Sequence, residues 1–151
     1  MNTKINDFII RPANINDVKP CAAMDEICFS LPWSEQSFFE EIVGNEIAQY
    51  IIAEAEGNVI GYAGIWAILD EGHITNIAVH PDFRRKGIAR TLISALLEET
   101  GSNGVKAYTL EVRASNESAI ALYKGLGFKH CGVRKKYYDD NDEDAVIMWK
   151  T

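Results

Sequence analysis

The feature that most constrains this chain is a basic turn placed between an apolar strand and an amphipathic helix. Residues 77–81 read Ile-Ala-Val-His-Pro, and residues 84–89 read Arg-Arg-Lys-Gly-Ile-Ala. The first amides of a helix have no partner inside it, and the helix dipole adds partial positive charge at the same end. Gly87 would let the backbone approach an anion closely, because glycine has no Cβ. The segment therefore predicts a phosphate-binding turn at the start of a helix.

The charge of the chain makes this basic turn a local feature. The 151 residues carry a formal net charge of −7, yet four cations fall within seven residues, namely Arg84, Arg85, Lys86 and Arg90. A nucleic-acid duplex needs an extended basic face, and this cluster is too compact for one. We therefore exclude nucleic acid as the main partner. An ordinary exposed basic turn is the remaining alternative from these residues alone.

Size and composition indicate one domain spanning residues 1–151, because 47% apolar residues suffice for a sizeable core. No apolar run approaches the roughly 20 residues that span a bilayer, and residues 1–7 lack the apolar stretch of a signal peptide. A cytoplasmic protein without a membrane anchor is therefore expected. The cysteines and histidines match no metal-ligand spacing, so no metal site is predicted. Small buried side chains are expected at Cys21, Cys28 and Cys131.

The first half of the chain predicts two helices and a three-strand meander after a short strand. The predicted elements are a strand at 8–11, helices at 14–29 and 34–44, and strands at 50–54, 59–68 and 73–79. Asn14 or Asn16 can cap the first helix, and Ser34 can cap the second. The apolar side of the second helix is expected to hold Phe38, Phe39, Ile42 and Val43.

The second half predicts a helical crossover and a closing hairpin. The predicted elements are a helix from 88 to about 101, a strand at 108–112, a helix from 115 or 116 to about 126, and paired strands at 128–134 and 145–149. Strand 108–112 is reached through a helix, so it should lie parallel to strand 73–79. The predicted class is α/β (α+β), with a mixed central sheet and helices on both faces.

The order of these elements and the turn Arg-x-x-Gly-x-Ala resemble the GCN5-related N-acetyltransferase (GNAT) superfamily over essentially the whole chain. A second motif, Leu-Glu-Val-Arg-Ala-Ser-Asn at 110–116 followed by Ala-Leu-Tyr at 121–123, is most similar to the bacterial ribosomal-protein-alanine N-acetyltransferases within it. The resemblance implies a GNAT fold of about seven strands, splayed between the fourth and fifth. It also implies acetyl-CoA as cosubstrate and the N-terminus of a basic ribosomal protein as acceptor.

Residue roles follow from the resemblance, position by position. It implies Glu111 as general base and Tyr123 as general acid. The residues implied to bind the cosubstrate are Ile77, Ala78 and Val79 along the pantetheine arm, Arg84, Arg85, Lys86, Gly87, Ile88, Ala89 and Arg90 around the pyrophosphate, and Asn116. Trp33 and Tyr137 are candidates for lining the acceptor cleft.

The chemistry of acetyl transfer fits these residue types. An amine must be neutral to attack, and an α-amine, with a pKa of about 7.7–8.0, is neutral at pH 7 far more often than a lysine with a pKa near 10.4. A carboxylate such as Glu111 can take the amine proton, and a phenol such as Tyr123 can protonate the leaving thiolate. An amide near Val79 is expected to stabilise the oxyanion. Asn116 lies two helical turns before Tyr123, so both can face one cleft.

Each assignment has a plainer alternative. Glu111 could be a surface charge paired with Arg113, and Tyr123 could be a core residue. The acidic residues of segment 139–144 could form a solvated loop, or they could attract a basic peptide. A structural role is expected for His73, His80 and His130.

Other functions share parts of this pattern. A GNAT enzyme acting on lysine, a polyamine or another small-molecule amine would carry the same cofactor motif, as would a non-catalytic CoA-binding module. A nucleotide-phosphate enzyme is disfavoured, because the patterns Gly-x-x-x-x-Gly-Lys-Ser/Thr and Gly-x-Gly-x-x-Gly are absent. The sequence does not indicate an oligomeric state.

Overall fold

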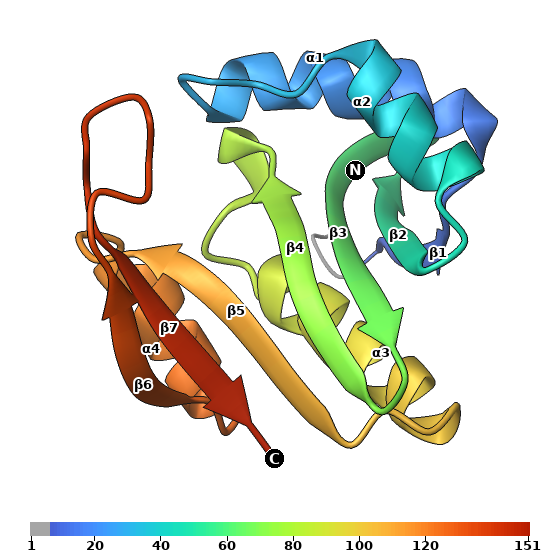
Figure 1. Ribbon diagram of the computed structural model, residues 1–151. Coiled ribbons are helices and arrows are strands. Elements are labelled where there is room, and N and C mark those ends of the chain that lie inside the picture. The colour runs from blue at the N-terminus through green and yellow to red at the C-terminus, as the bar shows by residue number, and fades with distance from the viewer. Residues whose placement is uncertain (1–6) are drawn as a thin grey trace.

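The computed structural model describes residues 7–151 as a central sheet with helices on both faces (Figure 1). The expectation of no signal peptide at residues 1–7 falls almost wholly outside these residues. The strands are β1 (Ile9–Pro12), β2 (Ala48–Ala55), β3 (Asn58–Ile68), β4 (Glu71–Val79), β5 (Ala107–Arg113), β6 (Lys129–Arg134) and β7 (Ala145–Lys150). The helices are α1 (Val18–Cys28), α2 (Glu35–Phe39), α3 (Ile88–Ser102) and α4 (Glu117–Gly125), with short turns η1 (Ile15–Asp17), η2 (Glu40–Gly44) and η3 (Pro81–Phe83).

The sheet has the order β1-β2-β3-β4-β5-β7-β6. Every neighbouring pair is antiparallel except β4 and β5, which are parallel. The parallel pairing covers only three residue pairs, from Glu71↔Ala107 to His73↔Thr109. Beyond that point the two strands diverge, as Figure 1 shows. The predicted mixed sheet, and the splay between its fourth and fifth strands, are therefore confirmed.

Two apolar cores hold the helices on opposite faces of the sheet. On one face, α3 presents Ile88, Leu92 and Leu96 at four-residue spacing, and all three are buried against β2, β3 and β4. On the other face, Phe38 packs edge-on against the ring of Tyr62, with ring centroids 5.3 Å apart. The helical stripe predicted from the sequence is the one that the structure buries.

The structure corrects the prediction for the second helix. Ser34 caps it as expected, since its hydroxyl accepts from the amide of Ser37, and Phe38 is buried. However, Phe39 is 40% exposed and Val43 is 49% exposed. After Phe39 the helix widens into the π-helical turn η2, which changes the angular position of Val43 but not that of Phe39. Only part of the predicted apolar side therefore faces the sheet.

The cysteines also differ from the expectation that all three are buried. Cys21 is buried and Cys28 is half-buried, but Cys131 is exposed. Cys131 lies on β6, the edge strand of the sheet, where a register shift between His130 and Gly132 leaves it without a paired residue. Within residues 7–151, no helix has both the length and the apolar character needed to cross a bilayer.

Candidate active site

The basic turn forms an amide-lined start to α3. Gly87 is the N-cap residue, with φ +81, and a Cβ added there would meet no atom within 4 Å. The amide of Thr91 is the first to bond back into the helix, to the carbonyl of Gly87 at 3.0 Å. The amides of Ile88, Ala89 and Arg90 therefore have no intrahelical acceptor. Gly87 supplies the left-handed conformation that turns the chain into the helix without a steric penalty.

The cations of this turn are presented in different ways. Arg85 is exposed and has a left-handed backbone conformation, with φ +63, and Lys86 is exposed beside it. Arg84 instead folds back, and its Nε donates to the carbonyl of Val79 at 3.0 Å. A phosphate group at the start of α3 would thus meet unpaired amides together with exposed side-chain cations, which fits an anion site.

The end of β4 has a free edge where the sheet splays. The amide of His80, directly after β4, donates to the carbonyl of Ile60 on β3 at 2.8 Å, so the backbone amide of His80 points toward β3. Hydrogen-bonding direction alternates along an antiparallel ladder, so the backbone groups of Val79 and Ile77 point away from β3, toward the gap next to β5. An extended ligand arm could pair with this edge as a strand would.

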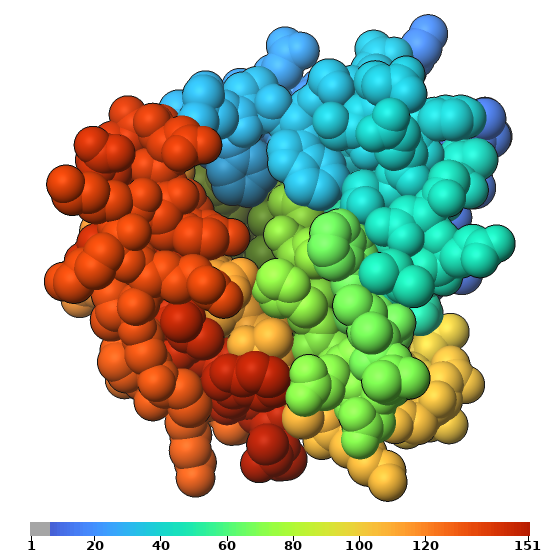
Figure 2. Space-filling model, viewed as in Figure 1, coloured from blue at the N-terminus to red at the C-terminus, as the bar shows by residue number. Residues whose placement is uncertain are grey.

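A cleft of about 510 Å³ opens above this gap. Its walls come from the α1–α2 loop, β4, β5, the start of α4 and the β6–β7 loop. Figure 2 shows the hollow between the blue N-terminal helices and the orange-red C-terminal segment. The residues that line it include Asp25, Trp33, Glu111, Asn116, Tyr123 and Tyr137.

The carboxylate of Glu111, on β5, is held by two neighbouring side chains, and only 11% of the Glu111 side chain is exposed. Its Oε1 lies 2.7 Å from Nε2 of His73, and its Oε2 lies 3.4 Å from Nε of Arg134. The His73 hydrogen bond, together with nearby positive charge, outweighs burial and holds the pKa of Glu111 below its usual range. The alternative pairing with Arg113 is wrong, because Arg113 binds Asp140 and Glu143 instead.

Tyr123 enters the same cleft from α4 and is buried. Its ring packs at a tilt on Phe128, with centroids 5.8 Å apart, and burial raises the pKa of its phenol to about 12. Asn116 caps α4, because its Oδ1 accepts from the amide of Ala119 at 3.2 Å. The structure therefore brings Glu111, Asn116 and Tyr123 together around one cleft.

The comparisons with known proteins agree with this geometry. Residues 19–128 match the Acetyltransferase (GNAT) family. The chain belongs to this family. It is 38% identical over 142 residues to a putative [ribosomal protein bS18]-alanine N-acetyltransferase of Bacillus subtilis, covering 94% of each chain. It is 39% identical over 136 residues to the [ribosomal protein bS18]-alanine N-acetyltransferase of Salmonella typhimurium, covering 87% of this chain and 89% of that one.

Solved structures place the chain in the same family. The crystal structure of the ribosomal-protein-S18-alanine N-acetyltransferase from Escherichia coli superposes with a TM-score of 0.87 and 35% identity, covering 95% of this chain and 92% of that chain. The predictions of the GNAT superfamily, its fold and an acetyltransferase are thereby confirmed. The roles assigned to individual residues stay predictions.

Two loops of this GNAT domain meet across the cleft through contacts that the sequence did not reveal. The guanidinium of Arg113 lies 4.0 Å from the ring centroid of Tyr138 and 2.8 Å from Oδ2 of Asp140. Ser30, in the α1–α2 loop, donates to the same carboxylate oxygen. Acidic side chains of the β6–β7 loop are thus engaged in fixed contacts, rather than forming only a solvated loop.

Asp25 and His73 are further residues that the sequence analysis did not place at the site. Asp25 is buried beside the cleft and accepts hydrogen bonds from the Tyr62 hydroxyl and from the amide of Trp33, the latter at 2.9 Å. Burial raises the pKa of Asp25 against the opposing effect of these bonds. His73 contacts Glu111 directly, at 2.7 Å, and the structural role expected for it stays a prediction. In the sequence, the one sign that these two residues could belong to the site was their polar character.

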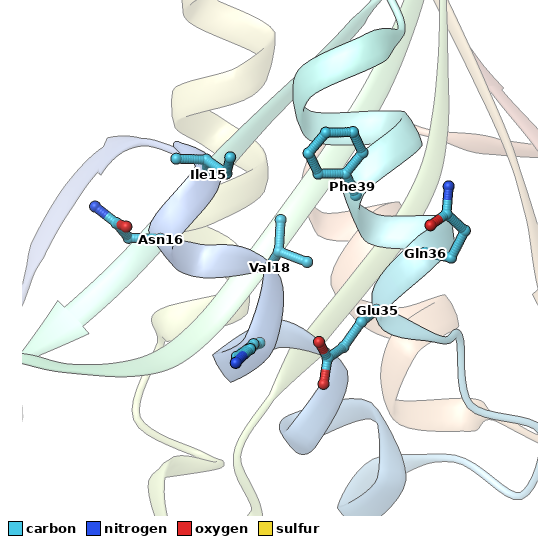
Figure 3. A pocket seen from close by; sticks show the side chains of 7 residues that line it. Ile15, Asn16, Val18, Glu35, Gln36 and Phe39 are labelled. Carbon is cyan, nitrogen blue, oxygen red and sulfur yellow. The ribbon is translucent and has the colours of Figure 1, made fainter.

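A second depression of about 480 Å³ lies between η1, α1 and α2. Figure 3 shows its side chains, which include Ile15, Phe39 and Glu35. It shares no lining residue with the cleft. Within residues 7–151, no group of three or more histidine, cysteine, aspartate or glutamate side chains is arranged to hold a metal ion.

Proposed function

We propose that this protein transfers the acetyl group of acetyl-CoA to the N-terminal alanine α-amine of the small-subunit ribosomal protein bS18. The observation that carries the proposal is that a carboxylate, Glu111, and a phenol, Tyr123, line one cleft where β4 and β5 diverge. The names of relatives that are 38–39% identical over most of the chain support the same reaction. We further propose that residues 1–151 form a single catalytic domain and that it acts in the cytoplasm.

The residues of the cofactor side fit acetyl-CoA, which supplies the acetyl group as a thioester. The unpaired amides at the start of α3, with Arg85, Lys86 and Arg90, would bind the pyrophosphate. The free edge of β4, at the backbone groups of Ile77 and the amide of Val79, would hold the pantetheine arm by strand-like pairing. Asn116 would contact the cosubstrate from the start of α4, where it also caps the helix. Arg84 would act less directly, since it already binds the carbonyl of Val79.

On the acceptor side, Glu111 would take a proton from the amine as it attacks. Its lowered pKa keeps it ionised at neutral pH, so it is ready to accept a proton. An α-amine has a pKa of about 7.7–8.0, so its proton is far easier to remove than that of lysine near 10.4. Tyr123, whose raised pKa keeps its phenol protonated, would give a proton to the leaving thiolate. The two groups thus take opposite roles because their surroundings shift their pKa values apart.

The walls of the cleft favour a cationic peptide terminus. Asp25, Glu111 and Asp139 line it, and the charge of the lining arginine, Arg113, is paired with Asp140 and Glu143. Trp33 and Tyr137 add aromatic surface on which a peptide backbone can lie. These features support a basic protein N-terminus as the acceptor.

The test is acetyl transfer from acetyl-CoA to three matched basic peptides. One begins with free alanine, one has the same terminus blocked by acetylation but carries an internal lysine, and one begins with a different residue. We expect transfer to the free-alanine peptide and little or none to the blocked one. Full-length bS18, followed by mass spectrometry of its N-terminal peptide, then tests the acceptor itself.

The other outcomes separate the alternatives. Transfer to the internal lysine would replace the α-amine assignment while keeping the cosubstrate. Transfer to polyamines or other small amines, but to no peptide, would make the protein a small-molecule acetyltransferase. Binding of acetyl-CoA with no transfer to any amine would support a non-catalytic CoA-binding module.

A further inference from the structure

His73 is the last residue of β4 that pairs with β5 before the two strands diverge. It is paired with Thr109 at the end of the parallel β4–β5 contact. Side chains alternate between faces along a strand, so Thr109 and Glu111 point to the same face, with Glu111 beyond the point of divergence. His73 reaches across this fork, and its Nε2 lies 2.7 Å from Oε1 of Glu111. The contact therefore joins the two strands where their backbone pairing has stopped.

The imidazole ring of His73 is itself held in place by Trp66 on the neighbouring strand β3. Its ring meets the indole of Trp66 edge-on, with centroids 6.4 Å apart and an interplanar angle of 89°. Trp66 lies opposite His73 in the β3–β4 ladder, and its Nε1 donates to Glu41 at 2.8 Å. A group fixed in this way can fix a carboxylate in turn, because few rotamers of His73 keep both contacts.

The arrangement leaves one oxygen of Glu111 for chemistry. Oε1 is taken by His73, whereas the partner of Oε2 is the more distant Arg134, whose side chain is 56% exposed. His73 is 35% exposed at the other side of the carboxylate, and it does not line the cleft. It can therefore orient Glu111 without touching the acceptor.

We propose that His73 is a positioning residue that holds the Glu111 carboxylate in its reactive orientation. The proposal rests on the proposed function, because it assigns Glu111 as the base. A hydrogen bond donated from Nε2 to Oε1 fixes the rotation of the carboxylate, while Oε2 stays able to accept a proton.

The other charged or titratable groups around this pair come from three elements. Glu111 faces Arg134 at the end of β6, together with Tyr137 and Tyr138 in the β6–β7 loop, and Glu41 reaches His73 only through Trp66. Burial raises the pKa values of both tyrosine hydroxyls, so they stay protonated at neutral pH. His73 at 2.7 Å is closer to the Glu111 carboxylate than Arg134 at 3.4 Å, so His73 is the partner better placed to orient it.

The test compares His73→Gln with His73→Ala on the free-alanine peptide. A glutamine amide can donate the same hydrogen bond but cannot gain a proton, so His73→Gln should keep kcat at pH 8.5 within about threefold of the wild type. His73→Ala should lose about tenfold or more in kcat, with smaller changes in KM, because the carboxylate is no longer oriented. His130→Gln, on the exposed edge strand, is the matched control and should behave as the wild type.

Rescue by the conservative variant separates positioning from a merely structural role. Only His73→Gln keeps a donor for Oε1, so it should retain kcat where His73→Ala does not, although both variants lose the imidazole ring and its packing on Trp66. Wild-type kcat in His73→Ala, or failure of His73→Gln to restore kcat, would overturn the inference.

A second readout does not depend on the acceptor. The ¹⁵N resonance of His73 Nε2, assigned by its loss in His73→Gln, should move when Glu111→Gln is introduced, and an unmoved resonance would exclude the contact. If the wild type acetylates no α-amine, the proposed function fails while this measurement still decides the coupling. If the wild type is active and His73→Ala is equally active, the inference alone fails.

Discussion

Ser30 and Asp140 lie 110 positions apart in the sequence and are hydrogen-bonded across the mouth of the cleft, with 2.6 Å between Oγ and Oδ2. Arg113 binds the same carboxylate oxygen from β5 at 2.8 Å. The Ser30 hydrogen bond and the Arg113 guanidinium together hold the pKa of Asp140 below its usual range. The carboxylate therefore stays ionised at neutral pH, and the α1–α2 and β6–β7 loops are joined there.

Removing this link should loosen the acceptor side of the cleft. In Ser30→Ala, the KM for the alanine peptide should rise roughly threefold, since one hydrogen bond to a charged group is lost, while kcat and the Kd for acetyl-CoA stay unchanged. Steady-state kinetics with varied peptide measures the effect. Ser102→Ala is the control, because Ser102 lies at the end of α3 and its hydroxyl donates to the carbonyl of Glu98 in the same helix. An unchanged peptide KM in Ser30→Ala would show that the link has no role in binding.

Substitution of Gly87 should weaken acetyl-CoA binding. An aspartate there would place a negative charge and a side chain against the unpaired amides of α3, so Kd should rise roughly tenfold, or about 1.4 kcal/mol. Isothermal titration calorimetry with acetyl-CoA measures the effect.

Gly104→Asp is the matched control for Gly87→Asp. Gly104 also has positive φ and open space at its Cβ position, but it follows the opposite end of α3, about 22 Å along the helix axis. The two variants should lose similar stability while only Gly87→Asp loses affinity. Equal affinities in both would place the phosphate site elsewhere.

Glu111→Gln should separate catalysis from cosubstrate binding. The amide cannot take a proton, so kcat should fall about a hundredfold or more, while the Kd for acetyl-CoA stays the same because the role proposed for Glu111 is toward the amine acceptor. Glu98→Gln, on the exposed side of α3, is the control and should be fully active. Wild-type turnover by Glu111→Gln would remove Glu111 as the base.

Tyr123 should be needed for turnover, and loss of its proton should not lower kcat at pH values up to about 10. Tyr123→Phe keeps the packing on Phe128 but removes the proton donor, so kcat should fall about a hundredfold. In the wild type the pKa of about 12 keeps the phenol protonated, so kcat should stay level as pH rises through 10, where an ordinary tyrosine would begin to lose its proton. A decline in kcat centred near pH 10 would contradict this assignment.

Tyr108→Phe is the control for the loss of a buried hydroxyl. The Tyr108 hydroxyl bonds to Thr100 and to the carbonyl of Leu97, away from the cleft. We expect the free energy of unfolding to fall by about 1 kcal/mol with normal kcat. Lost activity in both tyrosine variants would indicate a general effect of instability rather than a role for Tyr123.

Much of the fold was predictable because the apolar residues that recur at regular spacing along the chain are the ones that the core buries. The four-residue spacing of Ile88, Leu92 and Leu96 marks the face of α3 that the sheet buries. A helical crossover between two strands makes them parallel, which gives the β4–β5 pairing. The second helix was predicted less well, since nothing local in the sequence signals the π-helical turn after Phe39.

The sequence by itself determined the family, and it predicted an anion-binding turn at Gly87 and the candidate pair Glu111 and Tyr123, because these depend on residue types at short fixed spacings. Only the tertiary structure decided what surrounds that pair. The contacts of Glu111 with His73, and of Ser30 with Asp140, span 38 and 110 positions and join separate elements. Such contacts depend on how β4 and β5 diverge and how two loops approach, and no periodicity along the chain encodes those distances.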